Sequence, residues 1–380
     1  MPNRDITSLK IGVLGGGQLG RMMIQSAINY NLDISIIDPD EHAPCAHLVE
    51  SFTVGSLTDE ELIYKWGENF DLITIEIENV SVAALKRLQA EGVSVYPQPE
   101  IIELIQDKRK QKTFYKANRI PTADFVLTEN AVDVAQYKDK LPAVNKLGTE
   151  GYDGRGVQVL KSEKDLPKAF DKAGLLEDLV DFEKELSVVV ARNENGEMTC
   201  FPVVELSYHP EQNLVEFLFA PAQISEEVEQ KAYDLAKNVI KKLDMVGLLA
   251  VEMFLTKEDE LLVNEVAPRT HNSGHHTIEA NRTSQFEQHL RAVLNMPLGS
   301  TEMITPAAMV NLLGEDGFSG EALYQGMDSC LAMEGVYVRL YGKKLTKPFR
   351  KMGHVTITDG DIDQLKIKAR KVKDTLKIKA

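Results

Sequence analysis

The sequence is poor in cysteine and tryptophan and contains no long apolar run. Its three cysteines, Cys45, Cys200 and Cys330, are far apart and form no CxxC pair, which excludes a disulfide framework and a cysteine-held zinc site. Nowhere do about eighteen apolar residues follow one another, and the opening segment MPNRDITSLK lacks the apolar core of a signal peptide. We therefore expect a cytoplasmic protein without a membrane span.

Positive charge is also scarce, with 43 Lys and Arg against 58 Asp and Glu and a formal net charge of -15. A field of that sign repels phosphate, so general affinity for nucleic acid or anionic membranes is excluded and any phosphate site must be local. A basic run from Lys366 to Lys379 is the exception. We interpret it as a solvated final helix or tail in preference to a nucleic-acid arm.

The chain length of 380 residues suggests about two or three domains. Residues 1–103 alternate short apolar runs with helical stretches, as in LKIGVLG and DISIIDPD, which predicts a Rossmann-like α/β domain with a parallel sheet. A charged helix is predicted over residues 101–118. Residues 104–296 show longer strands joined by hairpins and a capped helix beginning at Ser225, typical of an α+β domain. Residues 297–380 predict a small β-rich C-terminal domain.

A glycine pattern follows the first predicted strand. Gly15, Gly17 and Gly20 form GxGxxG, and Asp38 ends the next predicted strand, which is the dinucleotide fingerprint. The physical content of the pattern is weaker, because glycines and a helix start accommodate many anions. An NAD site, a site for a substrate phosphate and a purely structural turn all remain open, although the rest of the chain favours the last two.

Two glutamates are predicted to face each other across a hairpin. In GLLAVEMFLTKEDELLVNEVAPR, a four-residue turn places Thr256 opposite Leu261 and therefore Glu252 opposite Glu265. Two carboxylates among apolar strand residues are destabilising unless a cation compensates them, and Mg²⁺ on a phosphate meets that need. Alternatively, one glutamate pairs with a buried arginine such as Arg269, or the register is off by one residue.

A second glycine-rich loop, GTEGYDGRG, lies between two predicted strands. Unlike a Walker A loop it is not followed by a helix, so it resembles a flap that folds over nucleotide phosphates. Lys146 on the preceding strand and Arg155 in the loop are placed to neutralise phosphate. The alternative is a surface lysine beside a mobile turn.

Polar residues crowd the segment after Glu265. The run APRTHNSGHH contains Arg269, His271, His275 and His276, but its spacing does not match an HExxH helix, which disfavours zinc. A guanidinium fork and an imidazole suit carboxylate, bicarbonate or phosphate. Anion recognition by Arg269 and His271 is therefore our interpretation.

Four motifs carry a family resemblance. GGGQLGRM at residues 15–22, GYDGRG at 151–156, VNEVAPRTHNSGH at 263–275 and YGKKLTKPFRKMGH at 341–354 resemble the 5-(carboxyamino)imidazole ribonucleotide synthetase family of purine biosynthesis. The resemblance implies a three-domain ATP-grasp fold and a homodimer. It also implies that ATP, bicarbonate and 5-aminoimidazole ribonucleotide react through carboxyphosphate to give the N-carboxylated ribonucleotide, ADP and phosphate.

The resemblance also implies roles for individual residues. ATP phosphates are held by Lys108, Lys146, Gly151, Tyr152, Asp153, Gly154, Arg155 and Gly156; adenine is contacted at Glu177, Asp178, Leu179 and Val180, the ribose by Glu185, and the nucleotide is approached by His209. Magnesium is carried by Glu252 and Glu265 beside Asn264, and bicarbonate and carboxyphosphate are handled by Arg269 and His271. The aminoimidazole substrate is contacted by Gln18, Leu19, Glu76, Tyr152, Asp153 and Arg155, with Lys343 and Arg350 on its phosphate.

The chain departs from the family pattern at three positions. Thr270 stands where proline is usual, which loosens the backbone beside His271; Asn145 replaces an aliphatic residue, and Lys108 stands where arginine is frequent. Without the resemblance, Lys343 and Arg350 are best interpreted as surface charge. Other functions considered are a formate-using ribonucleotide transformylase, an NAD-dependent dehydrogenase and a catalytically silent binding protein. We also expect the loop at residues 151–156 to close over the reacting groups.

Overall fold

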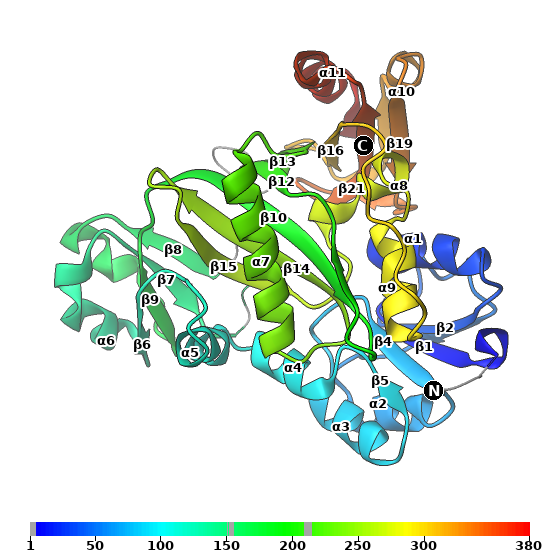
Figure 1. The fold of residues 1–380 in the computed structure, drawn as a ribbon, viewed down its shortest axis with the longest axis horizontal. Coiled ribbons are helices and arrows are strands. Elements are labelled where there is room, and N and C mark those ends of the chain that lie inside the picture. The colour runs from blue at the N-terminus through cyan, green and yellow to red at the C-terminus, as the bar shows by residue number, and fades with distance from the viewer. Residues whose placement is uncertain (1–4, 150, 152–155, 209–214) are drawn as a thin grey trace.

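The computed structural model describes residues 5–149, 151, 156–208 and 215–380. Its N-terminal part is a five-stranded parallel sheet in the order β3-β2-β1-β4-β5 (Figure 1), which confirms the predicted Rossmann-like α/β unit. The strands are β1 (Lys10–Leu14), β2 (Asp33–Asp38), β3 (Ser51–Val54), β4 (Leu72–Ile75) and β5 (Ser94–Val95). The helices are α1 (Gln18–Ile28), α2 (Glu60–Gly67), α3 (Val82–Ala90) and α4 (Pro99–Ile105).

The middle of the chain forms two antiparallel arrays, as its hairpin pattern predicted. A four-stranded sheet in the order β6-β9-β7-β8 lies at one end of the molecule (Figure 1), and β15, β14, β10, β12 and β13 belong to a larger sheet. The small sheet contains β6 (Phe125–Thr128), β7 (Ala143–Leu147), β8 (Val157–Leu160) and β9 (Gly174–Asp178), accompanied by α5 (Lys108–Ala117) and α6 (Ala131–Gln136). The large sheet contains β10 (Phe182–Arg192), β11 (Met198–Cys200), β12 (Val204–Tyr208), β13 (Val215–Ala220), β14 (Gly247–Thr256) and β15 (Leu261–Ala267).

The C-terminal strands continue this large sheet, because β13 pairs with β16 and β16 with β21. The predicted boundary at residues 103/104 falls inside α4, and the one at 296/297 follows α9; both stay predictions. The remaining helices are α7 (Glu226–Lys242), α8 (Thr277–Ala280), α9 (Gln285–Val293), α10 (Met327–Leu331) and α11 (Ile362–Thr375). The remaining strands are β16 (Ala307–Leu313), β17 (Gly320–Glu321), β18 (Leu323–Gln325), β19 (Val336–Leu340), β20 (Leu345–Thr346), β21 (Lys351–Thr358) and β22 (Lys377–Lys379).

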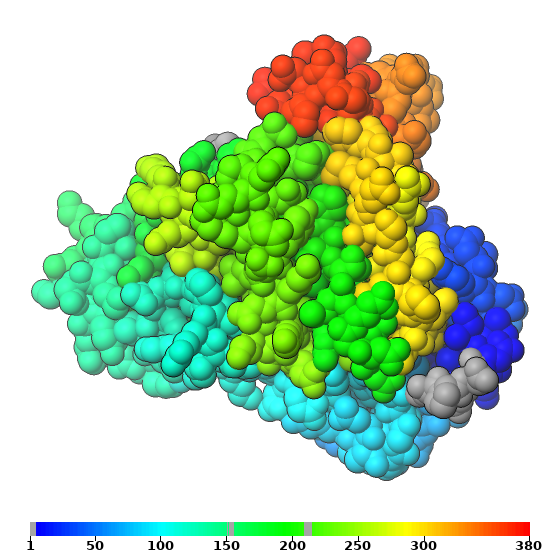
Figure 2. Space-filling model, in the orientation of Figure 1, coloured from blue at the N-terminus to red at the C-terminus, as the bar shows by residue number. Residues whose placement is uncertain are grey.

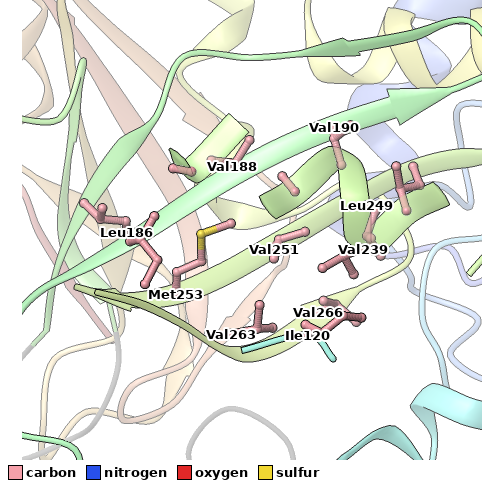
Figure 3. Close-up of a cluster of buried hydrophobic side chains, with 14 of the residues drawn as sticks. Ile120, Leu186, Val188, Val190, Val239, Leu249, Val251, Met253, Val263 and Val266 are labelled. Carbon is pink, nitrogen blue, oxygen red and sulfur yellow. The ribbon is translucent and has the colours of Figure 1, made fainter. Parts of the chain in front are cut away.

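Helix α7 covers one face of the central strands and forms the main core with them. Its Val239 packs among Leu249 and Val251 of β14 and Val188 of β10 (Figure 3). The predicted cap at Ser225 is confirmed, because its side chain accepts a hydrogen bond from the Val228 N–H. Burial of this continuous apolar surface makes β10 and β14 a rigid platform for the polar residues they carry.

Helix α9 lies between the large sheet and the N-terminal unit. Its Phe286, Leu290 and Val293 belong to the same buried cluster as Met22 and Met23 of α1. In the space-filling view the yellow segment containing α9 runs between the green middle part of the chain and the blue N-terminal unit (Figure 2). This helix therefore connects two parts of the protein that are distant in sequence.

The single charged helix predicted over residues 101–118 was wrong, because two helices meet there. Asp107 interrupts the segment by capping α5, accepting a hydrogen bond from the Arg109 N–H at 2.8 Å. The interruption frees the Lys108 N–H, which donates to the carbonyl of Gly148 at 2.8 Å. Lys108 thereby starts α5 instead of lying within a longer helix.

The basic C-terminal run forms α11 and the short β22, and its charges lie on the solvent side. Leu365, Ala369 and Val372 face the core, whereas Lys368 pairs with Asp359 at 2.7 Å and Lys373 pairs with Glu216. The interpretation as a solvated helix is thus confirmed. Among the helices of the described residues, none has both the length and the apolar character needed to cross a membrane.

Candidate active site

The glycine loop after β1 is filled by a carboxylate from the chain itself. Glu76, directly after β4, is buried and accepts a hydrogen bond from the Leu19 N–H at 3.1 Å. A Cβ on Gly17 would lie 2.5 Å from Oε1 of Glu76, and Gly15 has a φ of +104°, so glycine is needed at both positions. The start of α1 therefore holds a carboxylate where a dinucleotide-binding loop holds phosphate.

The second element of the dinucleotide fingerprint is also used internally. Asp38 accepts a hydrogen bond from the Gly16 N–H at 2.7 Å and another from the Asp40 N–H at 2.8 Å, which occupies both carboxylate oxygens. Burial raises the pKa of Glu76 to about 7. The loop thus binds carboxylates of the chain itself. The dehydrogenase interpretation loses its support, because Asp38 and the glycine loop already have partners within the chain.

The C-terminal part reaches this loop through Lys343. Its Nζ donates to Oε1 of Gln18 at 3.0 Å and to the carbonyl of Lys351 at 2.8 Å. The structure therefore brings together Gln18, Leu19 and Lys343, which the resemblance had grouped, and Glu76 joins them through Leu19. For Arg350 the structure shows a hydrogen bond to the carbonyl of Leu345 at 2.8 Å, within its own loop.

The two predicted glutamates pair directly across β14 and β15. The predicted turn was one residue too long, however, because the Thr256 N–H donates to the carbonyl of Glu260 at 2.9 Å and Leu255 pairs with Leu261. An irregularity after Glu252 restores the predicted pairing, since Met253 faces Val263 and Glu252 faces Glu265. Asn264 is the extra residue of this bulge.

The bulge redirects side chains, as bulges next to functional sites do. Asn264 Oδ1 accepts a hydrogen bond from Nζ of Lys146 at 3.0 Å, and Glu265 Oε2 accepts one from Nζ of Lys108 at 2.6 Å. Two neighbouring residues of β15 thus reach lysines on two different elements, β7 and α5. The predicted grouping of Lys108, Lys146, Asn264 and Glu265 is what the structure shows.

Glu177, at the end of β9, lies between two lysines. Its Oε2 is 2.6 Å from Nζ of Lys146 and its Oε1 is 2.7 Å from Nζ of Lys112. The side chains of Glu177 and Lys112 are each only 3% exposed, so the pair is retained at a considerable desolvation cost. Glu177 therefore sets the direction of Lys146. The predicted adenine contacts at Asp178, Leu179 and Val180 follow directly in the chain.

The protonation of the paired glutamates differs. Burial and the facing Glu265 carboxylate raise the pKa of Glu252, whereas the neighbouring Lys108 ammonium lowers the pKa of Glu265. Burial also raises the pKa of Glu185 on β10 to about 7. Ionisation of Glu252 together with Glu265 is therefore unfavourable in the site as it stands, and a cation between the two carboxylates would favour it.

Arg269 and His271 lie beside this hairpin but have different partners. Arg269 Nε is 2.9 Å from Oε2 of Glu78, an acid that the sequence pattern did not indicate as its partner. His271 Nε2 lies 3.7 Å from Oε1 of Glu252, and Ser273 N–H donates to its Nδ1 at 3.3 Å. The imidazole is therefore held between η4 (Asn272–Gly274) and the glutamate pair.

The remaining histidines of the segment take no part in this cluster. His275 and His276 are fully buried, and burial lowers the pKa of each, to about 4 for His276. Within the ranges that the structure describes, no three His, Cys, Asp or Glu side chains are grouped as ligands for a metal ion. Two carboxylates supply only part of the six oxygens that Mg²⁺ requires, so the donor set fits a magnesium ion that arrives on a phosphate.

The sequence departures are accommodated locally. Asn145 is buried, donates to the carbonyl of Leu175 at 3.1 Å and accepts from the Phe170 N–H at 2.8 Å. Thr270 is buried, and its carbonyl accepts a hydrogen bond from Nη1 of Arg269 at 3.0 Å.

Tyr152, Asp153, Gly154, Arg155 and His209 lie outside the described residues, as does most of the loop whose closure was expected. Its two ends are described, and a Cβ on Gly156 would lie 3.0 Å from Cα of Gly151. The close approach of these ends requires glycine.

Sequence reasoning missed Lys112 and Gln285. Lys112 follows Lys108 by four residues and so lies on the same face of α5, a spacing that could have indicated a shared site. Gln285 gives no such signal in the sequence, because the residue that it contacts, His271, lies in a separate loop.

Fold and site together define an ATP-grasp ligase. The chain matches the ATP-grasp domain over residues 113–286, preceded by a ribonucleotide synthetase preATP-grasp domain over residues 8–106. Residues 307–368 match the phosphoribosylaminoimidazole carboxylase C-terminal domain.

The particular family follows from whole-chain comparisons: the chain belongs to the N5-carboxyaminoimidazole ribonucleotide synthase family. It is 40% identical to the synthase of Bacillus subtilis over 91% of this chain and 90% of that protein. The synthetase structure from Thermotoga maritima superposes with a TM-score of 0.91 at 43% identity, covering 98% and 99% of the two chains. The Aspergillus clavatus synthase in complex with ADP and 5-aminoimidazole ribonucleotide gives 0.87 at 31% identity, covering 97% and 98%.

Longer relatives also match. The chain covers 65% of the chloroplastic phosphoribosylaminoimidazole carboxylase of Vigna aconitifolia, to which it is 39% identical over 93% of its own length.

Proposed function

We propose that this protein uses ATP and bicarbonate to carboxylate the amine of 5-aminoimidazole ribonucleotide, releasing ADP and phosphate, as a step of purine synthesis. The observation that carries the proposal is the pairing of Glu252 with Glu265 across the hairpin, with Lys108 and Lys146 beside it. These side chains form a charge pattern complementary to a metal-bound triphosphate.

The nucleotide end of the site is built by the middle part of the chain. Lys108 and Lys146 neutralise ATP phosphates, the backbone from Glu177 to Val180 receives adenine, and Glu185 receives the ribose. Glu252 and Glu265, with Asn264 beside them, hold Mg²⁺, which supplies charge neutralisation and alignment of the phosphates when bound. The raised pKa of Glu252 beside Glu265 supports this assignment, because a cation relieves the repulsion that causes the shift.

The acceptor end is built by the N- and C-terminal parts. Glu76, Gln18 and Leu19 contact the aminoimidazole, and Lys343 and Arg350 bind its phosphate. Arg269 and His271 bind bicarbonate and the carboxyphosphate formed from it. Lys146 stabilises charge on the transferred phosphoryl group. Tyr152, Asp153 and Arg155 complete both ends in this proposal, and His209 lies near the nucleotide. Exclusion of water by the loop at residues 151–156 protects carboxyphosphate from hydrolysis.

Three further properties belong to the proposal. The protein acts in the cytoplasm, it is a homodimer, and its partners are small molecules and neither nucleic acid nor membrane. The formal net charge of -15 supports the last point, because a field of that sign disfavours anionic polymers and lipid surfaces.

The decisive experiment measures ADP release by the purified protein at fixed Mg-ATP, with and without 5-aminoimidazole ribonucleotide, in bicarbonate and separately in formate. We expect turnover that depends on both the ribonucleotide and bicarbonate. Turnover with formate in place of bicarbonate selects a transformylase instead. ADP release that does not respond to the ribonucleotide contradicts the proposed acceptor.

A further inference from the structure

A buried amide holds both backbone polar groups of His271. Gln285, the first residue of α9, is fully buried, and its Oε1 accepts a hydrogen bond from the His271 N–H at 2.9 Å. Its Nε2 donates to the His271 carbonyl at 2.6 Å and lies 3.2 Å from Nδ1 of His275. A Cβ on Gly274 would lie 2.5 Å from Oε1 of Gln285. The loop thus leaves room for this amide by placing glycine opposite it.

The ring of His271 is fixed as well as its backbone. Ser273 N–H donates to Nδ1 at 3.3 Å and the Ser273 hydroxyl lies 3.0 Å from the same atom. Ser273 is in turn bonded to the hydroxyl of Ser187 on β10 at 2.9 Å. With the peptide groups held by Gln285 and Nδ1 held by Ser273, the Nε2 edge of the ring faces Glu252 at 3.7 Å.

The helix that carries Gln285 is anchored on the N-terminal unit. One turn along α9, Nε2 of His289 lies 2.9 Å from the hydroxyl of Thr74 in β4, and β4 leads directly to Glu76. The apolar side of α9 packs against α1, which begins at Gln18. Through α9, the amide of Gln285 therefore fixes His271 relative to the glycine loop, which contacts the aminoimidazole substrate in the proposed function.

We infer that Gln285 is a positioning residue, which holds the imidazole of His271 between the glutamate pair and the acceptor loop. The inference rests on the proposed role of His271 in carboxyl transfer.

The chain contains a matched control on the same helix. Gln288 is equally buried, and it holds Gly299 in the same bidentate way, with the Gly299 N–H donating to its Oε1 at 2.9 Å and its Nε2 donating to the Gly299 carbonyl at 3.1 Å. Gly299 lies in the connection after α9. Gln285→Leu and Gln288→Leu therefore break equivalent bonds, but only the first acts on His271.

The test compares these two variants with His271→Asn and the unchanged enzyme, measuring kcat for ribonucleotide-dependent ADP release, KM for ATP and the melting temperature. We expect Gln285→Leu to lower kcat at least about tenfold with KM for ATP within about twofold, and Gln288→Leu to keep kcat within about twofold. Both should lose similar thermal stability. Equal kcat in the two leucine variants overturns the inference.

The conservative variant Gln285→Glu adds a pH readout. A carboxyl group in this place repels the His271 carbonyl when ionised and donates to it when protonated, so its kcat relative to the unchanged enzyme should rise as pH falls from about 8 to 6. The titratable groups nearby are His271 and His275, with His276, His354 and Lys351 around His275. A pH profile identical to that of the unchanged enzyme contradicts the inference.

The outcomes separate the inference from the proposed function. If His271→Asn keeps full kcat, the proposed role of His271 fails and the positioning role fails with it. If His271→Asn loses activity while Gln285→Leu behaves as Gln288→Leu does, only the positioning role fails and the proposed function stands.

Discussion

The glycine loop at residues 15–20 and the glutamate hairpin both look like nucleotide sites in the sequence, yet their charges are balanced differently. In the loop, the donors at the start of α1 meet Glu76, and Asp38 holds Gly16. In the hairpin, two carboxylates face each other, Lys108 donates a hydrogen bond to Glu265, and the imidazole of His271 lies 3.7 Å from Glu252. The loop is completed by its own chain, whereas the hairpin leaves Glu252 and Glu265 facing each other, a repulsion that the proposed Mg²⁺ would relieve.

This difference explains why the more familiar motif, GxGxxG, is the poorer guide to function. GxGxxG reports that a backbone approaches an anion, and here the chain supplies that anion. Facing carboxylates indicate an unfavourable free energy of desolvation and repulsion, which the fold by itself does not offset. A site that is unfavourable without its ligand indicates function more directly than a site that is already satisfied.

The largest effect is expected from removing one charge of the hairpin. Glu252→Gln and Glu265→Gln should each lower ADP release on the order of 10³-fold, because two ligands of the proposed metal are then reduced to one. The two substitutions should change stability in different directions. Glu252→Gln removes one of two like charges that face each other, so the melting temperature should stay the same or rise. Glu265→Gln removes the partner of Lys108 at a cost of about 1 kcal/mol, kept small by the 45% exposure of the Glu265 side chain.

These two variants are compared by ADP release and by thermal unfolding with and without Mg-ATP. Wild-type turnover in either variant contradicts the metal assignment. A lower melting temperature for Glu252→Gln than for Glu265→Gln contradicts the account of how the charge is distributed.

A substitution of Glu76, which fills the glycine loop, should affect the use of the ribonucleotide and not of ATP. Glu76→Gln should lower kcat/KM for the ribonucleotide about 10- to 100-fold while KM for ATP stays within about twofold, because we propose that Glu76 contacts the aminoimidazole. Steady-state kinetics with each substrate varied separately measures both. A rise in KM for ATP alone means that the loop serves the nucleotide.

The fit between Gly17 and Glu76 predicts a stability effect of intermediate size. Gly17→Ala should destabilise by about 1–3 kcal/mol because its Cβ would lie 2.5 Å from Glu76 Oε1. The same change in a Glu76→Ala background should cost far less. Gly360→Ala, where no atom lies within 4 Å of the added Cβ, is the control. Equal costs of Gly17→Ala in both backgrounds would falsify the assigned contact.

The last effect, a change in stability with pH and not in activity, concerns helix α9, which joins the two regions. Burial lowers the pKa of His289 from 6.5 to about 4, so between these pH values a proton binds the unfolded chain and not the folded one, and stability falls as pH falls. By about pH 5 the loss is roughly 2 kcal/mol. The melting temperature of His289→Gln should therefore fall less than that of the unchanged protein between pH 7 and 5; parallel decreases contradict this assignment.

Local pattern predicted much of the fold and of the hairpin. Apolar spacing predicted α7 with its Ser225 cap, and alternation around a polar turn predicted that Glu252 faces Glu265. The same counting misplaced the turn by one residue, because it assumed an unbroken ladder and Asn264 forms a bulge. The helix over residues 101–118 was wrong for a similar reason, since the carbonyl of Gly148 competes for the Lys108 N–H where Asp107 caps α5.

The sequence by itself determined most of the strands and helices, which groups are charged, and that two acids converge on one hairpin, because periodicity and turn chemistry act between neighbours along the chain. Only the tertiary structure decided that Glu76 fills the glycine loop, that Lys112 and Lys146 share Glu177, and that Gln285 holds His271. Each of these contacts joins residues that no local spacing relates. They form because a buried polar group must find a partner wherever the packed chain brings one.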